Sequence, residues 1–345
     1  MIASPPIPLI VADGDIPTTR LVAHELGVEF PRVEVRVPDT LFGTEFAGRP
    51  IIFSRLCDPG LSWLPEYLQG RGLRYAYLLD DNFWELTPDF DIHVAPYFSN
   101  PAVRATLDRF IRGAAVVIVW SERLRDYIAA KFPGIAVEFV PSGVDLAQVR
   151  KLRPVEARAD DGIVRIGYPT SRRPGVALLL AEVVRAIVER FPGRVQFEFV
   201  GWMSESLEAL PGVTLMPQIA EYDAYLAFVL SRQWDVGLAP LAGVHFESFK
   251  TDVKYREYAA FGVAGVYSRM SPYTETVQAG RTGVLVDNDP QAWIAALAAL
   301  IESRRMREDI SAAAFADISE HRDLEVTGRR FAAVLPAGAD DRRAT

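Results

Sequence analysis

Lysine is scarce in this chain of 345 residues: four of its 37 basic residues are lysines, and two of them, Lys250 and Lys254, stand four positions apart. A single cysteine, Cys57, excludes an internal disulfide framework and a metal site built from several cysteines, and it fits a reducing compartment. Acidic residues number 45, and the resulting net charge of −8 argues against a general nucleic-acid-binding protein.

Long hydrophobic runs are absent as well. No window reaches the roughly 20 apolar residues that a transmembrane helix needs, and the N-terminal stretch lacks the basic region of a signal peptide. These absences predict a cytoplasmic protein without a transmembrane segment, with peripheral membrane contact left open. The patterns G-x-G-x-x-G and G-x-x-x-x-G-K-[ST] do not occur, which disfavours a dinucleotide oxidoreductase or an NTPase.

Short apolar stretches alternate with amphipathic helical patterns along the whole chain. "RPIIFSRL" and "RYAYLLDD" are candidate strands of the first half, and "VQFEFVGW" and "WDVGLAPL" are candidates of the second. Continuous apolar runs are typical of buried parallel strands, and a strand–helix repeat predicts a parallel sheet covered by helices. A charged, proline-containing segment near residues 149–162 predicts a linker. We therefore expect an α/β protein of two Rossmann-like domains, residues 1–150 and 151–335, facing across a cleft, with a flexible tail over 336–345.

The lysine pair lies just after the candidate strand "WDVGLAPL". Lys250, Lys254 and Glu257 have the spacing of one helix face. Asp252 favours a helix start there, and Gly262 favours its end. Because the amino end of a helix already carries partial positive charge, ammonium groups at this place predict a bound phosphate or diphosphate. The alternative is a solvated Lys254–Glu257 ion pair that contributes only a few tenths of a kcal/mol.

The stretch "ESFKTDVKYREYAAFGVAGVYS" resembles the donor half of GT-B fold, nucleotide-sugar-dependent glycosyltransferases, family 4 in particular. "EYAAFGVAGVYS" is similar to the second glutamate, short helix and G-x-P-V-V-x-S of that family, and "GRTGVLVDND" is similar to its G-x-T-G-x-L-V segment. The resemblance spans about residues 163–335 and is architectural in the first half, apart from "EFVPSGVDL". It implies the GT-B fold, with residues 1–150 on the acceptor side and residues 151–335 binding the sugar donor.

The resemblance also implies residue roles. Glu257 takes the place of the family's second glutamate, which holds the ribose hydroxyls of the nucleotide. Glu247 stands ten residues earlier, whereas the family's spacing would place the first glutamate at Phe249. Either the loop is longer here or Glu247 does not contact the sugar. Lys250 and Lys254 would neutralise the leaving diphosphate. The residues expected at the donor sugar are Glu247, Ser248, Phe249 and Tyr273.

A second phosphate-binding loop is predicted in "GYPTSRRPG", after the first candidate strand of the second half. Thr170 and Ser171 offer hydroxyl donors, and Arg172 and Arg173 offer cations to the diphosphate. The alternative is an exposed turn that caps the next helix.

Asp80 and Asp81 end the candidate strand "RYAYLLDD". Paired carboxylates can bind Mg²⁺, act as a general base or accept hydrogen bonds from a sugar acceptor. The alternative is that one of them caps the following turn. Similar strand ends face the cleft in the glycosyltransferase group, so we expect a role toward the acceptor and no metal. The predicted catalytic residues are Asp80, Asp81, Glu247 and Lys254.

The resemblance thus implies a glycosyltransferase of hexosyltransferase type that retains anomeric configuration and acts in glycan or polysaccharide synthesis. A nucleoside diphosphate sugar is its co-substrate, and no separate cofactor is expected. The acceptor would be a glycan, a lipid-linked molecule or a small molecule, and no nucleic-acid partner is expected. Two alternatives stay open: a non-hydrolysing nucleotide-sugar epimerase, and a catalytically silent GT-B domain that binds sugars or partners.

Overall fold

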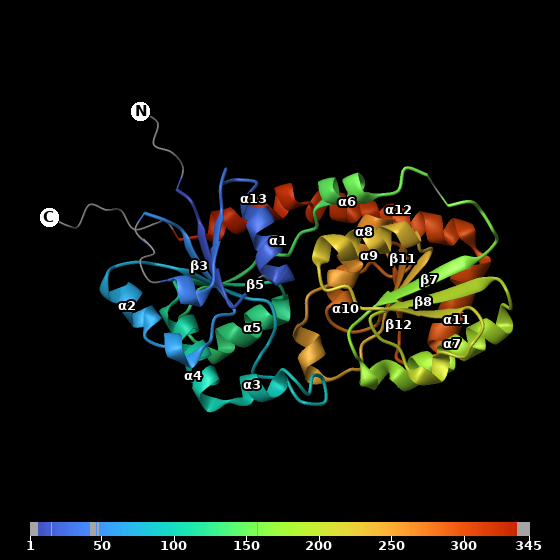
Figure 1. Ribbon diagram of the computed structural model, residues 1–345, viewed down its shortest axis with the longest axis horizontal. Helices are drawn as coiled ribbons and strands as arrows, with labels where there is room; N and C mark the ends of the chain where they lie inside the picture. The colour runs from blue at the N-terminus through green and yellow to red at the C-terminus, as the bar shows by residue number, and fades with distance from the viewer. Residues whose placement is uncertain (1–5, 15, 42–45, 47, 157, 337–345) are drawn as a thin grey trace. The chain divides into compact units, whose positions relative to one another are not determined.

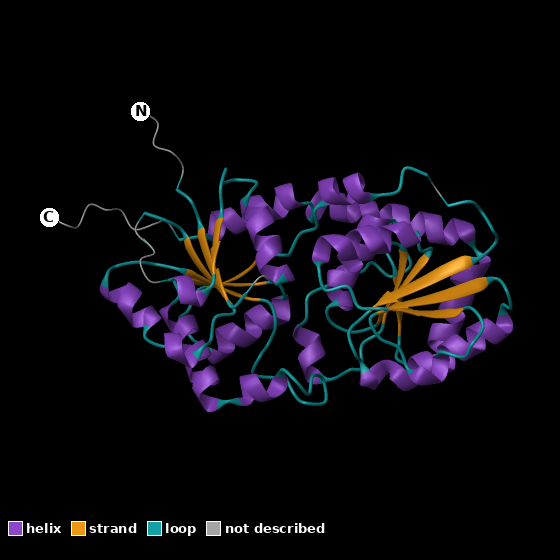
Figure 2. Cartoon of the chain, viewed as in Figure 1, coloured by secondary structure: helices purple, strands orange, loops and turns teal. Residues whose placement is uncertain are grey.

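The computed structural model describes residues 6–14, 16–41, 46, 48–156 and 158–336. By their internal contacts the residues form two compact units, each built on one six-stranded parallel sheet with helices on its faces (Figures 1 and 2). The first unit comprises Met1–Gly143, Phe249–Thr251 and Arg322–Thr345, and the second comprises Val144–Ser248 and Asp252–His321. The predicted α/β fold with two parallel sheets is confirmed.

The sheet of the first unit has the strand order β2-β1-β3-β4-β5-β6. Its strands are β1 (Leu9–Ala12), β2 (Glu34–Arg36), β3 (Ile51–Ser54), β4 (Ala76–Leu79), β5 (Val116–Val119) and β6 (Val137–Phe139). Every residue of β1, β3, β4 and β5 is buried, as the continuous apolar runs predict for central parallel strands.

Helices cover both faces of this first sheet. They are α1 (Pro17–Leu26), η1 (Pro38–Thr40), η2 (Pro59–Leu61), α2 (Leu64–Gly70), α3 (Ala95–Ser99), α4 (Pro101–Gly113), α5 (Glu122–Lys131) and α13 (Leu324–Val334). The chain's last described helix, α13, packs beside α1 (Figure 1). Its Phe331 is fully buried in the same hydrophobic cluster as Ile10 of β1 and Leu26 of α1.

The sheet of the second unit has the strand order β12-β11-β10-β7-β8-β9. Its strands are β7 (Val164–Pro169), β8 (Val195–Val200), β9 (Val213–Met216), β10 (Val236–Ala239), β11 (Ala264–Ser268) and β12 (Val284–Val286). Its helices are α6 (Leu146–Leu152), η3 (Pro174–Val176), α7 (Ala177–Arg190), η4 (Glu205–Leu207), α8 (Tyr222–Arg232), η5 (His245–Phe249), α9 (Val253–Phe261), α10 (Tyr273–Thr276), α11 (Pro290–Glu302) and α12 (Arg304–His321).

Three helix starts follow the capping signals in the sequence. Asn100 accepts a hydrogen bond from the Ala102 N–H at 2.9 Å, and Ser121 accepts one from Leu124 at 3.4 Å. Asp289 caps α11 in the same way. Side chains of this kind satisfy amide groups that have no partner inside the helix, so these three side chains fix where α4, α5 and α11 begin.

Each sheet has one switch point, where successive strands stop being added on one side of the sheet and are added on the other. It lies between β1 and β3 in the first sheet and between β7 and β10 in the second. In open α/β sheets, ligands bind at the carboxyl ends of the strands that flank such a point. The loops after β1 and β3, and after β7 and β10, are therefore the places where sites are expected within each unit.

The predicted domain boundaries, 1–150, 151–335 and 336–345, stay predictions, and residues 337–345 of the expected tail lie outside the described residues. In the predicted linker, the described residues between the end of α6 and the start of β7 form neither helix nor strand. Within the described parts of the chain, no helix is both long enough and apolar enough to cross a membrane.

Candidate functional site

The segment from the end of β10 into α9 carries the two lysines, and the structure separates them: Lys250 lies in the loop and Lys254 lies in the helix. Helix α9 begins at Val253, so Lys250 precedes it and lies outside its faces. The prediction that Lys250, Lys254 and Glu257 share one helix face is therefore wrong for Lys250. The predicted end is confirmed: Gly262 follows α9 with φ of 74°, a left-handed conformation that favours glycine.

Lys254 and Glu257 form a pair on the first turns of α9. Lys254 Nζ lies 2.9 Å from Glu257 Oε2, and the hydroxyl of Tyr225, on α8, donates to the same oxygen at 3.0 Å. Glu257 is 5% exposed, so the alternative of a solvated surface pair is wrong. Burial, and next the charge of Glu257, raise the pKa of Tyr225 well above its usual range. The cluster is thus an ammonium, a carboxylate and a neutral phenol held together in a mostly buried place.

Lys250 belongs to the segment Phe249–Thr251, which is grouped with the first unit. Its Nζ lies 3.1 Å from Asp81 Oδ1 and 5.2 Å from the centre of the Phe90 ring. The Phe249 ring packs edge-on against Tyr127, with centroids 5.3 Å apart. The two lysines of the motif thus face different carboxylates, Asp81 and Glu257.

Glu247, predicted at the donor sugar, is 2% exposed. Its Oε2 accepts the backbone N–H groups of Gly243 at 2.8 Å and of Val244 at 3.3 Å. Burial raises its pKa, against the lowering effect of these amides and of the charge of Arg173. The carboxylate therefore stabilises the turn before η5. The sugar contact predicted for it stays a prediction.

The other residues predicted at the donor sugar are placed as follows. The Ser248 hydroxyl donates to the His245 carbonyl at 2.7 Å, and its own carbonyl accepts the Ser271 hydroxyl at 2.8 Å. Tyr273 is 4% exposed, and its ring lies 4.8 Å from that of Tyr267. These contacts tie the loop after β10 to the segment after β11, and they place Tyr273 in the core beneath that loop.

The predicted second phosphate loop follows β7, on the other side of the switch point from β10. Burial raises the pKa of Glu247, and it raises the pKa of Tyr168 to about 12. The charge of Arg173 opposes both of these shifts. Arg173, rather than Arg172, is therefore the cation that acts on neighbouring groups here. Arg172 is exposed. The Thr170 hydroxyl donates to the Ser171 carbonyl at 2.8 Å.

The capping alternative for this loop is not what the structure shows. Arg173 stands at the N-cap position of η3 without a side-chain cap, and Val176 stands at the N-cap position of α7, again without one. Phosphate binding by this loop stays a prediction.

Asp80 and Asp81 follow β4 in the first unit, one strand away from the switch point. Asp80 is 6% exposed; it accepts the Thr18 hydroxyl at 2.6 Å and lies 3.3 Å from Arg55 Nε. Asp81 pairs with Lys250. Within the described residues both carboxylates contact side chains, so the alternative that one of them caps the next turn is wrong.

Arg55 and Tyr225 also belong to these clusters, although no sequence pattern predicted a role for them. Arg55 directly follows β3, has φ of 58° and sits 4.8 Å from the Phe83 ring centre. Although burial opposes its charge, Asp80 and Asp81 hold the pKa of Arg55 above its usual value. Its place at the end of a strand next to β4 is a signal that would have found it. Tyr225 gave no such signal, because its approach to Glu257 depends on how α8 packs against α9.

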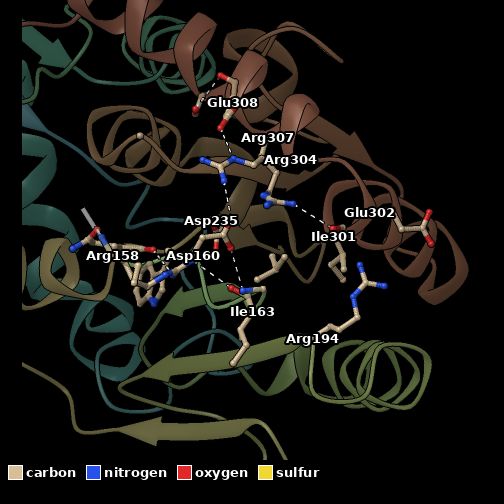
Figure 3. A pocket seen from close by; sticks show the side chains of 17 residues that line it. Arg158, Asp160, Ile163, Arg194, Asp235, Ile301, Glu302, Arg304, Arg307 and Glu308 are labelled. Carbon is tan, nitrogen blue, oxygen red and sulfur yellow. Dashed lines mark hydrogen bonds and ion pairs between the residues drawn. The ribbon is translucent and has the colours of Figure 1, made fainter. Parts of the chain in front are cut away.

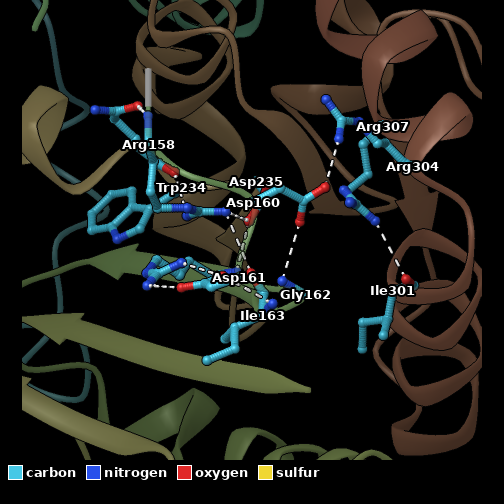
Figure 4. Close-up of polar contacts among 12 residues, drawn as sticks. Arg158, Asp160, Asp161, Gly162, Ile163, Trp234, Asp235, Ile301, Arg304 and Arg307 are labelled. Carbon is cyan, nitrogen blue, oxygen red and sulfur yellow. Dashed lines mark hydrogen bonds and ion pairs between the residues drawn. The ribbon is translucent and has the colours of Figure 1, made fainter. Parts of the chain in front are cut away.

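Figure 3 shows a cavity of about 390 Å³ in the second unit, at the amino ends of β7, β10 and β11. Its arginines are engaged within the protein: Arg158 lies 2.9 Å from Asp235, and Arg304 lies 3.0 Å from Asp160 (Figure 4). Arg307 donates to main-chain carbonyls at the end of α11. Because this edge of the sheet is opposite to the one where ligands bind in such folds, a ligand is expected at the carboxyl edge and not in this cavity.

Within the part of the chain that the structure describes, no three or more His, Cys, Asp and Glu side chains gather as metal ligands would.

Comparison with known proteins finds a family similar to the second unit. Residues 161–303 match the model of the family Glycosyl transferases group 1, and no curated protein sequence matches the chain. This match covers the β7, β10 and α9 loops described above.

Solved structures are similar over most of the chain. A trehalose-6-phosphate structure from E. coli bound with UDP-2-fluoro glucose has a TM-score of 0.61 at 16% identity, covering 86% of this chain and 74% of its own. Sucrose-phosphate synthase from Thermosynechococcus elongatus has a TM-score of 0.65 at 13% identity, covering 95% and 98%. HepE from Anabaena in complex with UDP has a TM-score of 0.65 at 15% identity, also covering 95% and 98%.

These likenesses show the fold, and the family match is in line with the resemblance seen in the sequence. Together they support transferase activity. The chain has the GT-B fold of two Rossmann-like units, and its residues 161–303 are similar to the glycosyltransferase group 1 family.

Proposed function

We propose that the protein transfers a hexosyl group from a nucleoside diphosphate sugar to an acceptor hydroxyl, with retention of anomeric configuration, in glycan or polysaccharide synthesis. The observation that carries this proposal is the Lys254–Glu257–Tyr225 cluster. Lys254 and Glu257 lie on α9, the helix that follows β10 beside the switch point, within the residues that match the group 1 family, and Tyr225 reaches Glu257 from α8. Two similar structures hold UDP or a UDP sugar, so UDP is the nucleotide to test first.

In this proposal the second carboxylate oxygen of Glu257, Oε1, binds the ribose of the nucleotide. Lys254 and Tyr225 both contact Oε2. Oε1 then accepts hydrogen bonds from the ribose hydroxyls, because an ionised carboxylate only accepts hydrogen bonds. Lys254, with amides at the start of α9, stabilises the negative charge that develops on the departing diphosphate. Of the two arginines predicted at the diphosphate, Arg173, across the switch point after β7, is the second cation in our proposal.

Lys250 takes a different role from the one the sequence suggested. It is paired with Asp81 and Phe90, so in our proposal it orients the Asp81 carboxylate toward the acceptor hydroxyl. The departing phosphate oxygen would accept the acceptor's proton in a front-face retaining reaction. A cytoplasmic location is proposed because nucleotide sugars are the co-substrates and Cys57 is the sole cysteine.

Product formation with UDP, GDP, ADP and CMP sugars tests the proposal directly. We expect transfer to an added saccharide, or slow donor hydrolysis when no acceptor is present. Conversion of the donor to its epimer would instead identify an epimerase. Binding without any turnover would identify a silent sugar-binding domain. A thermal-shift screen with the four nucleotides selects the base before the assay.

Replacing Lys254 with glutamine is expected to weaken UDP binding by at least tenfold and to leave uridine binding nearly unchanged. The lost interaction is Coulombic and acts on the diphosphate, while glutamine keeps a donor for Glu257. Calorimetric titrations with UDP and uridine measure the difference. Lys151→Gln, a change of an exposed lysine on α6, is the matched control. Equal weakening of both ligands by Lys254→Gln would show that Lys254 acts through the fold.

A further inference from the structure

A cavity of about 640 Å³ opens in the first unit, between the segments that follow β2 and β3. The side chains that decide its chemistry are Asp39, Leu41, Asp58, Leu61, Trp63 and Tyr67. These segments leave the carboxyl edge of the sheet beside the β1–β3 switch point, where ligands bind in folds of this type. Asp80 and Asp81, after the neighbouring strand β4, share that edge.

Two aromatic rings at the start of α2 are exposed in this cavity. Trp63 is 45% exposed and Tyr67 is 41% exposed, with their ring centroids 5.5 Å apart at an angle of 82°. The other tryptophans of the chain are buried or half-buried, as is usual for so large an apolar side chain. Arg71 stands 4.4 Å from the centre of the Tyr67 ring and helps to hold that ring in place. Rings placed in this way offer rigid apolar surface to a ligand.

The charged groups in the lining are carboxylates. Asp39 and Asp58 line the cavity, and no lysine, arginine or histidine is among its described lining residues. Asp58 is fixed, because its Oδ1 accepts the Gly60 N–H at 2.7 Å. Ionised carboxylates only accept hydrogen bonds and repel anions. The lining therefore suits a ligand rich in hydroxyl donors and without charge, and it disfavours sugar phosphates and anionic lipid headgroups.

A neutral saccharide combines the two requirements, because one face of a pyranose ring presents C–H groups and its edge presents hydroxyls. We propose that this cavity binds a neutral saccharide as the acceptor, with Trp63 and Tyr67 against the apolar faces of its rings and Asp39 and Asp58 accepting from its hydroxyls. The acceptor role rests on the proposed transferase function, whereas saccharide binding itself does not.

Saccharide binding is measured on the full chain by calorimetry, with glucose, maltose and cellobiose as probes, and UDP is titrated in parallel. We expect at least one disaccharide to bind more tightly than glucose. Trp63→Ala is expected to weaken that binding by at least tenfold, Trp63→Phe to restore most of it, and Asp58→Asn to weaken it by a smaller factor. UDP affinity should not change in any of these variants.

The matched control is Tyr97→Ala, which removes an equally exposed aromatic ring (44%) that does not line the cavity. Unchanged disaccharide affinity in Trp63→Ala would overturn the proposal, as would tighter binding of glucose 6-phosphate than of glucose. Binding to phosphatidylcholine vesicles that depends on Trp63, without saccharide binding, would overturn it in favour of a membrane surface. Melting curves confirm that each variant is folded.

The same titrations separate this proposal from the proposed function. If sugar is transferred but Trp63→Ala leaves the acceptor KM unchanged, the cavity is not the acceptor site and the transferase function stands. If disaccharides bind through Trp63 but neither nucleotide nor nucleotide sugar binds, the acceptor role is overturned together with the transferase function.

Discussion

UDP binding is expected to weaken roughly 10- to 150-fold when Glu257 is replaced with alanine, which corresponds to about 1.5–3 kcal/mol for hydrogen bonds to a charged group. The carboxylate is 5% exposed and fixed by Lys254 and Tyr225, so it meets the ribose hydroxyls already oriented. Calorimetry with UDP and with UMP measures the loss, and both ligands should lose the same factor because both carry the ribose.

The substitution also leaves Lys254 without its carboxylate partner, so part of the loss arises indirectly. Tyr225→Phe separates the two effects: it removes the 3.0 Å hydrogen bond to Glu257 and keeps both charges. We expect it to weaken UDP binding by less than tenfold. Glu122→Ala, which removes a glutamate with 56% exposure that lies 3.9 Å from Arg125, is the control and should have no effect. Unchanged UDP affinity in Glu257→Ala would remove Glu257 from the nucleotide site.

Much of the fold follows from patterns that act locally. Continuous apolar stretches such as "IIFS" and "AYLL" become fully buried strands, since a parallel sheet covered on both faces leaves no strand face for polar residues. Asn100 and Ser121 begin helices because their side chains satisfy amides two and three residues ahead. Each of these signals lies within a few residues of its effect.

The candidate site is less predictable because its contacts join distant parts of the chain. Lys250 and Asp81 are 169 residues apart, and nothing near either residue indicates the pair. Asp252 does mark the helix start, because it is the N-cap residue of α9. The helical spacing of Lys250 and Lys254 still misleads, because the helix begins only at Val253, after Lys250. Similarly, the sequence "RRP" does not distinguish Arg172 from Arg173; only the position of Glu247 in the folded loop does so.

Asp80 and Asp81 illustrate both cases. Their place at the end of a buried strand was predictable from "AYLLDD", and it locates them at the carboxyl edge of the first sheet. The different partners of the two carboxylates were not predictable from the sequence. Asp80 is held by Thr18 and Arg55, whereas Asp81 has Lys250 as its partner. Asp80 therefore serves to position Arg55, and Asp81 is the carboxylate we expect at the acceptor.

Replacing Asp81 with asparagine is expected to lower the rate of sugar transfer by about 10²- to 10⁴-fold, the range for a positioned side chain that assists the removal of a proton, while UDP binding stays unchanged. Asparagine keeps the shape of the side chain but loses the charge that accepts from the acceptor hydroxyl and attracts Lys250. Lys250→Gln is the comparison. If it lowers the transfer rate less than Asp81→Asn does, Asp81 acts on the acceptor itself. If both variants lower the rate equally, Asp81 acts only by holding Lys250. Initial rates of transfer, with and without EDTA, provide the measurement, and no inhibition by EDTA is expected. Loss of UDP affinity in Asp81→Asn, or rescue of chelated enzyme by Mg²⁺ or Mn²⁺, would place Asp81 at a metal site and contradict its role at the acceptor.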